Sequence, residues 1–272
     1  MRSVDIDGLQ VAYERAGDGP PVMLLHGAVA DSRVWRRQIE DLADEFTVVA
    51  WDAPGAGRTP DPPGPFGLAD WADVLAAFLR ALELGPSHVL GLSWGGSLAI
   101  ELYRRHPVTV ASLILADTYA GWKGSLSPEL CAERLEMALR TSEMTPNELI
   151  SEWLPQLLTE DASPERTDEL IAVMSDFHPA GLRLMAHAMA EADLSEVLPR
   201  IDVPTLLVWG GRDQRAPLSI AEGMYDAIPD ATLAVMPDAG HESNVEQPAR
   251  FNAEVRRFCR SVSGARAAKA DR

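Results

Sequence analysis

The sequence predicts an α/β domain in which a mostly parallel, eight-stranded sheet is flanked by helices and interrupted by a helical insert. Short apolar runs alternate along the chain with segments of helical periodicity, and the runs are apolar throughout, as strands buried on both faces are. About 90 residues separate two of these runs, far more than an ordinary connection in such a sheet needs. The expected fold is therefore a sheet between two helical layers, with one large insertion.

The parallel part of the sheet is expected at residues 21–25, 46–50, 88–92, 113–116, 205–209 and 232–236. The covering helices are expected at residues 33–44, 69–84, 95–106, 218–227 and 248–261. In the first 16 residues, apolar and polar side chains alternate across Gly8, which predicts an antiparallel hairpin at the sheet edge.

We expect residues 1–118 and 199–262 to form the core, and residues 119–198 to form a helical cap inserted between two strands. Four prolines of the insert stand where new helical patterns start, and proline is common in the first turn of a helix. These prolines are Pro128, Pro146, Pro164 and Pro179. Five of the nine methionines fall here, and we interpret them mainly as gap-filling residues between helices. Residues 263–272 lack apolar periodicity and are expected to be a disordered tail.

The composition argues against several classes of partner. The formal net charge is -17, which repels nucleic-acid phosphates and anionic membrane surfaces, so we expect neither as a partner. The insert alone carries 15 acidic and 5 basic side chains, which we interpret as a solubilising surface.

Cys131 and Cys259 are expected to be free thiols, because their spacing fits neither a metal site nor a disulfide scaffold. No signal peptide or spanning segment is visible, and we expect a cytoplasmic monomer or homodimer.

Ser93 is the candidate nucleophile. The segment Gly91-Leu92-Ser93-Trp94-Gly95-Gly96 follows an apolar run and opens a helical segment, which is the context of a strained strand-to-helix turn that presents a serine. The pattern alone arises by chance in about one chain of this composition in ten. The prediction therefore depends on the strand before it and the helix after it.

Serine needs a neighbouring base, and that base needs a third group to orient it. His241 is the candidate base, because it lies in a glycine-containing loop directly after the last expected strand. Asp213 is the candidate acid, because it follows the strand at residues 205–209 and because functional groups gather at the carboxyl ends of parallel strands. Asp117, at the end of the preceding strand, remains a rival to Asp213.

An acyl-transfer site also needs two N–H donors that face the oxyanion of the tetrahedral intermediate. We expect one donor to be the backbone N–H of Trp94, the residue after the nucleophile. The second is expected from the loop after residues 21–25, at Ala28.

Five segments occur in an order and context typical of the α/β-hydrolase superfamily: His26-Gly27, Asp52 to Thr59, Gly91 to Gly96, Gly210 to Asp213, and Gly240 to Glu242. The chain resembles capped serine hydrolases of that superfamily, and is similar to bacterial esterases and 3-oxoadipate enol-lactonases. The resemblance spans roughly residues 4–260. It implies the α/β-hydrolase fold. It also implies that the segment from Asp52 to Thr59 maintains the conformation of a loop and takes no part in the reaction.

The resemblance implies a serine hydrolase that cleaves a small apolar or moderately polar ester or lactone through an acyl-enzyme, without metal or cofactor. Epoxide hydrolases and haloalkane dehalogenases of the superfamily carry aspartate where this chain has Ser93. A carbon–carbon bond hydrolase or a cofactor-free perhydrolase of the same fold remains an alternative, as does a non-catalytic receptor that binds a small molecule.

Overall fold

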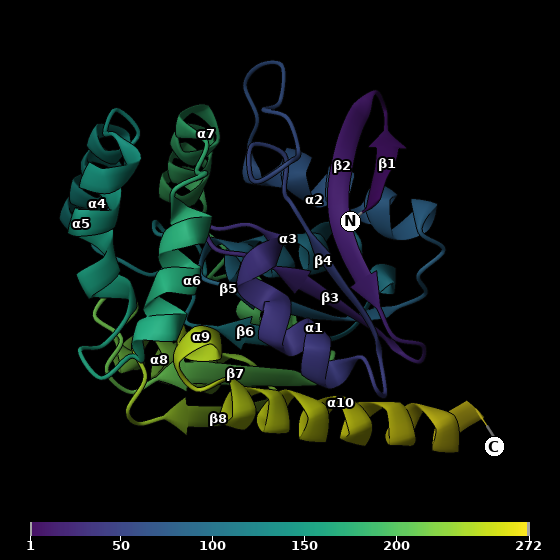
Figure 1. The fold of residues 1–272 in the computed structure, drawn as a ribbon. Helices are drawn as coiled ribbons and strands as arrows, with labels where there is room; N and C mark the ends of the chain where they lie inside the picture. Colours follow the sequence, from purple (N-terminus) through teal and green to yellow (C-terminus); the bar gives the residue numbers. More distant parts are fainter. Residues whose placement is uncertain (1, 271–272) are drawn as a thin grey trace.

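The computed structural model describes residues 2–270 and contains one eight-stranded sheet with the strand order β1-β2-β4-β3-β5-β6-β7-β8 (Figure 1). The strands are β1 (Arg2–Ile6), β2 (Leu9–Ala16), β3 (Pro21–Leu25), β4 (Thr47–Trp51), β5 (Ser87–Leu92), β6 (Val110–Ala116), β7 (Thr205–Gly210) and β8 (Ala231–Met236). Strands β3 to β8 pair in parallel, whereas β1 and β2 pair antiparallel with their neighbours. The predicted fold class is confirmed.

Strands β1 and β2 form the predicted edge hairpin. Asp7 and Gly8 connect them with φ angles of 51° and 88°, both in the left-handed region. A two-residue turn with two positive φ angles matches the twist of an antiparallel pair. This hairpin lies at the edge of the sheet that is opposite β8.

Two helical layers cover the sheet, because consecutive side chains of each strand point to opposite faces. Met23 packs in one apolar cluster with helices α2 (Leu68–Ala81), α3 (Trp94–Arg105) and α8 (Leu218–Ala227). Leu24 packs in the other with α1 (Arg36–Leu42) and α10 (Pro248–Ala270). The strands between the layers are therefore apolar on both faces, as predicted. No helix within residues 2–270 is both long enough and apolar enough to cross a membrane.

The insert between β6 and β7 contains four helices, and each begins at the predicted proline. They are α4 (Pro128–Thr141), α5 (Pro146–Leu157), α6 (Pro164–Met174) and α7 (Pro179–Glu191). The side chain of Thr145 accepts the N–H of Glu148, and the Glu148 carboxylate accepts the N–H of Thr145, so α5 begins with a reciprocal cap. In Figure 1 the four helices gather beyond the end of the sheet toward which β8 points.

The C-terminal segment differs from the prediction. Helix α10 continues to Ala270, so the expected disordered tail at residues 263–272 is helical through residue 270, and residues 271–272 lie outside the described residues. The segment Ala265-Arg266-Ala267-Ala268-Lys269-Ala270 consists of strong helix formers, which extend a helix without an apolar face. Apolar periodicity alone does not detect such an extension.

Candidate active site

Ser93 lies between β5 and α3 in a backbone conformation that residues with side chains rarely adopt, with φ 55° and ψ −119°. A Cβ on Gly91 would overlap the carbonyl oxygen of Gly95, and a Cβ on Gly95 would overlap that of Leu25. Glycine at both positions therefore permits the tight turn. The serine side chain is presented at the carboxyl end of β5, as the sequence predicts.

The structure brings Ser93, His241 and Asp213 together from three separate segments. The Nε2 atom of His241 lies 2.9 Å from the Oγ of Ser93, and its Nδ1 lies 2.8 Å from Oδ2 of Asp213. The imidazole is almost fully buried, with 2% of the residue exposed. With the proton on Nδ1 donated to Asp213, Nε2 is free to accept the serine proton.

Asp213 is held in place by its own loop. Its Oδ1 accepts the backbone N–H groups of Arg215 and Ala216 at 2.7 and 2.9 Å, while Oδ2 faces His241. The loop follows β7, and the loop that carries His241 follows β8. Because β7 and β8 are adjacent parallel strands, Asp213 and His241 both lie at the carboxyl end of the sheet.

The rival acid, Asp117, is engaged elsewhere. Its Oδ1 accepts the N–H of Gly210 at 2.7 Å, and its Oδ2 accepts the hydroxyl of Ser243 at 2.6 Å. Burial, and secondarily the neighbouring charge of Asp213, raise the pKa of Asp117 well above its usual value. The geometry therefore pairs His241 with Asp213.

The loop after β3 lies against Ser93. A Cβ built on Gly27 would sit 3.6 Å from the Cβ of Ser93, and Ala28 and Trp94 both line the cavity that Ser93 faces. His26 fixes this loop, because its Nδ1 donates to the carbonyl of Gly27 at 2.7 Å and its Nε2 accepts the N–H of Ala53 at 3.0 Å. Burial lowers the pKa of His26, which keeps the ring neutral for both contacts.

Asp52 connects neighbouring loops. Its two carboxylate oxygens accept the N–H groups of Ser32 and Arg58 at 2.8 and 2.9 Å. These contacts fit the expected role in loop shape.

The cavity in front of Ser93 lies between the sheet and the insert and has a volume of about 40 Å³. Most of the residues in its wall are apolar. Helices α4, α5 and α7 contribute part of the wall, including Met185 and Met189, and Trp122 joins it from the segment before α4. Two arginines, Arg134 and Arg215, also line it. Met185 and Met189 thus fill space between helices and also form the wall of this cavity.

Glu242 is a buried carboxyl group in the same cavity, directly after His241. Its Oε2 has no hydrogen-bond partner among the described residues. Burial, and then the charges of Asp213 and Glu246, raise its pKa to about 8. Glu242 is therefore mostly protonated and uncharged at neutral pH.

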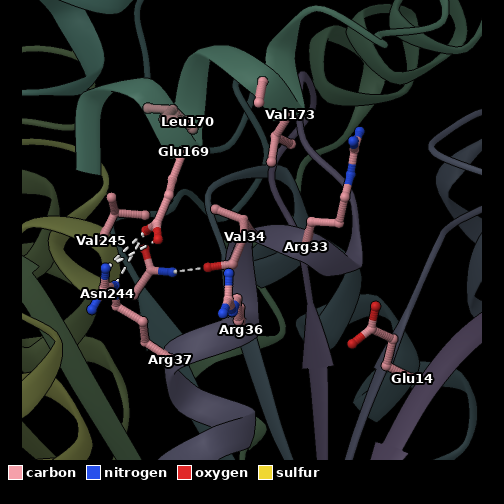
Figure 2. Close-up of a pocket in the computed structure, with 11 residues that line it drawn as sticks. Glu14, Arg33, Val34, Arg36, Arg37, Glu169, Leu170, Val173, Asn244 and Val245 are labelled. Carbon is pink, nitrogen blue, oxygen red and sulfur yellow. Dashed lines mark hydrogen bonds and ion pairs between the residues drawn. The ribbon is translucent and has the colours of Figure 1, made fainter. Parts of the chain in front are cut away.

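A larger cavity of about 280 Å³ lies away from the triad, between α1 and α6 (Figure 2). The residues that line it include no serine, cysteine or histidine. Its Arg37 contacts the carboxylates of Glu165 and Glu169 at 3.1 and 3.0 Å, as Figure 2 shows for Glu169. This cavity therefore contains neither a candidate nucleophile nor, at Arg37, a cation free for a ligand.

Comparison with known proteins identifies the family of this chain. A family model described as the Alpha/beta hydrolase family matches residues 22–254. The chain belongs to the alpha/beta hydrolase family. The match includes every residue of the predicted triad and both predicted oxyanion donors.

Three similar proteins place this alpha/beta hydrolase among relatives with several activities. A thermophilic esterase from Thermogutta terrifontis, in its malate-bound form, superposes with a TM-score of 0.89 at 33% identity, and the match covers 96% of this chain and 99% of the other. The enol-lactonase from Burkholderia xenovorans superposes with a TM-score of 0.85 at 26% identity, over 95% and 99% of the two chains. The dihydrolipoyllysine-residue acetyltransferase component of the acetoin cleaving system of Cupriavidus necator is 31% identical, over 93% of this chain and 67% of the other.

Sequence reasoning did not single out three residues of the cavity wall: Arg134, Arg215 and Glu242. Arg215 stands two residues after Asp213, and Glu242 directly follows His241, so proximity to predicted site residues was an available signal. Arg134 lies on a helix of the insert and carries no motif. Only the fold brings it beside Arg215, which is 81 residues away in the chain.

Proposed function

We propose that this alpha/beta hydrolase cleaves small carboxylic esters or lactones through an acyl-enzyme on Ser93. The observation that carries the proposal is the imidazole of His241, which lies within hydrogen-bond distance of both Ser93 Oγ and Asp213 Oδ2. An esterase and an enol-lactonase among the similar structures support this class of substrate.

In the first half-reaction, Ser93 Oγ attacks the substrate carbonyl carbon and passes its proton to Nε2 of His241. Asp213 stabilises the resulting imidazolium through the Nδ1–H hydrogen bond. The oxyanion forms in front of the N–H groups of Ala28 and Trp94, which line the same cavity. When the oxyanion collapses, the bond to the leaving oxygen breaks, and that oxygen takes the proton from His241.

In the second half-reaction, His241 removes a proton from water, and the hydroxide oxygen attacks the acyl carbon. The bond to Ser93 Oγ then breaks, and His241 returns the proton to the serine. For a lactone, the leaving oxygen stays attached to the acyl chain, so one hydroxy acid is released. The cycle restores Ser93 and His241 to their starting states.

The decisive experiment measures 4-nitrophenyl ester and lactone hydrolysis by the wild-type protein and by Ser93→Ala, together with labelling by a fluorophosphonate probe. We expect Ser93→Ala to lose turnover by at least about 10³-fold and to lose the label. Ser219→Ala, which changes an exposed serine on α8, is the control and keeps both. Turnover retained by folded Ser93→Ala, or no turnover of any ester or lactone by the wild-type protein, would overturn the proposal.

A further inference from the structure

Arg134 and Arg215 lie in the wall of the catalytic cavity, and neither has a carboxylate partner among residues 2–270. Nη1 of Arg215 donates to the amide oxygen of Gln156 at 3.3 Å, and its guanidinium stacks 4.1 Å from the ring centre of Trp153. Nη2 of Arg134 donates to the backbone carbonyl of Arg215 at 2.6 Å, and its guanidinium lies 5.4 Å from the ring centre of Tyr119. All four contacts are with neutral groups.

Arginines nearby in the sequence behave differently. Arg140, on the same helix as Arg134, pairs with Glu152 at 3.1 Å. Arg212, three residues before Arg215, pairs with Glu160 and with Asp161, the latter at 2.7 Å. In a chain with a net charge of -17, carboxylates are abundant, yet none within the described residues pairs with either guanidinium group at this cavity.

The charged groups around the two guanidinium groups leave the cavity wall positive. Burial lowers the pKa of Arg215 to about 10, so it remains a cation at neutral pH. Glu242 is mostly uncharged there, because its pKa is raised to about 8. The Asp213 carboxylate is already engaged by His241 and by two backbone N–H groups. Burying cations costs free energy unless an anion pairs with them.

The two arginines also stand between the catalytic cavity and the surface. Together with Ala138 and Trp153 they line a second, outer cavity, whose wall also includes Glu133 and Gln156 from α4 and α5. A molecule that extends outward from Ser93 past these residues meets both guanidinium groups. Between them and Ser93 the wall is mainly apolar and suits a short hydrocarbon chain.

We propose that Arg134 and Arg215 bind a free carboxylate at the far end of the substrate, so that the enzyme prefers esters or lactones of dicarboxylic acids to neutral ones. The proposal rests on the proposed hydrolytic function of Ser93. Paired arginines suit a carboxylate because each guanidinium offers N–H donors in a planar array. Hydrogen bonds between charged groups in a partly dry cavity are strong enough to select one substrate over another of the same shape.

The test compares two substrates of nearly equal shape, mono-4-nitrophenyl glutarate and 4-nitrophenyl 5-methylhexanoate, in which an isopropyl group replaces the carboxylate. We expect the wild-type enzyme to favour the glutarate in kcat/KM. Arg134→Met and Arg215→Met should each lower the ratio of the two kcat/KM values by about 10- to 100-fold. The Lys variants, which keep the charge but lose the planar donors, should retain part of the preference.

Arg140→Met and Arg212→Met are the matched controls and should keep the wild-type ratio, because those arginines lie outside the catalytic cavity. Fluorophosphonate labelling and melting temperature report whether each variant is folded. The proposal is overturned if the wild-type enzyme shows no preference for the glutarate, or if Arg→Met slows both substrates equally in folded, labelled protein. If the wild-type enzyme hydrolyses neither these substrates nor any other ester or lactone, the proposed function itself fails instead.

Discussion

The carboxylate of Asp117 accepts a hydrogen bond of 2.6 Å from the hydroxyl of Ser243, two residues after His241. Asp117 thus supports the loop that carries His241, while Asp213 contacts the imidazole of His241 itself. Because the pKa of Asp117 is raised well above its usual value, an uncharged amide is a close substitute for it.

We therefore expect Asp117→Asn to retain activity within about tenfold of wild type, and Asp213→Asn to lower kcat/KM by about 10³- to 10⁴-fold, because the amide favours the wrong imidazole tautomer. Steady-state kinetics with one 4-nitrophenyl ester, on variants with matched circular dichroism spectra, is the measurement. If Asp117→Asn lowered kcat/KM as much as Asp213→Asn, the assignment of Asp213 rather than Asp117 as the acid that orients His241 would be wrong.

Ionisation of Glu242 should lower the activity of the enzyme at alkaline pH. Above pH 8 its carboxyl group ionises and places a negative charge beside Asp213, near the site where the oxyanion forms. We expect kcat/KM of the wild-type enzyme to fall through this range, and that of Glu242→Gln to stay level. Superimposable pH profiles for the two proteins would contradict this role.

The same group links stability to pH. Its pKa is about 8 in the folded protein and close to 4.5 in the unfolded chain, so the folded state keeps a proton that the unfolded state has lost between these values. The free energy of unfolding of wild type, relative to Glu242→Gln, should decrease as pH rises from about 5 to 8 and then level off. Urea unfolding of both proteins at pH 5, 6.5, 8 and 9 measures the difference.

Glu246 connects the insert to the loop that holds His241. Its carboxylate accepts the N–H of Thr159 at 2.9 Å and the N–H of Gly240 at 2.5 Å. Glu246→Ala leaves the buried N–H of Gly240 and the partly buried N–H of Thr159 without an acceptor, so we expect the free energy of unfolding to fall by about 1–3 kcal/mol and kcat to fall as well.

Chemical denaturation together with ester turnover tests the role of Glu246. Glu254→Ala is the control, because its partner Arg257 is exposed on α10 and such pairs contribute little. A Glu246→Ala variant as stable and active as this control would show that the contact is unimportant.

The sequence predicted the eight strands, the proline-initiated helices and the positions of Ser93, His241 and Asp213, because these depend on short-range patterns and on the rule that parallel strands end at one edge. It did not predict the neutral state of Glu242, since burial decides that pKa and burial depends on the whole fold. Nor did it pair Arg134 with Arg215, which only the docking of α4 brings together.

The chain order of the site has a consequence during synthesis. His241 follows Ser93 by 148 residues, so at 5–20 residues per second a ribosome needs roughly 7–30 s to make the base after it has made the nucleophile. The sheet also needs β7 and β8 before Asp213 and His241 can reach Ser93. Under the proposed mechanism, the growing polypeptide therefore lacks a complete triad, and Ser93 stays unreactive toward esters, until β7 and β8 have joined the sheet.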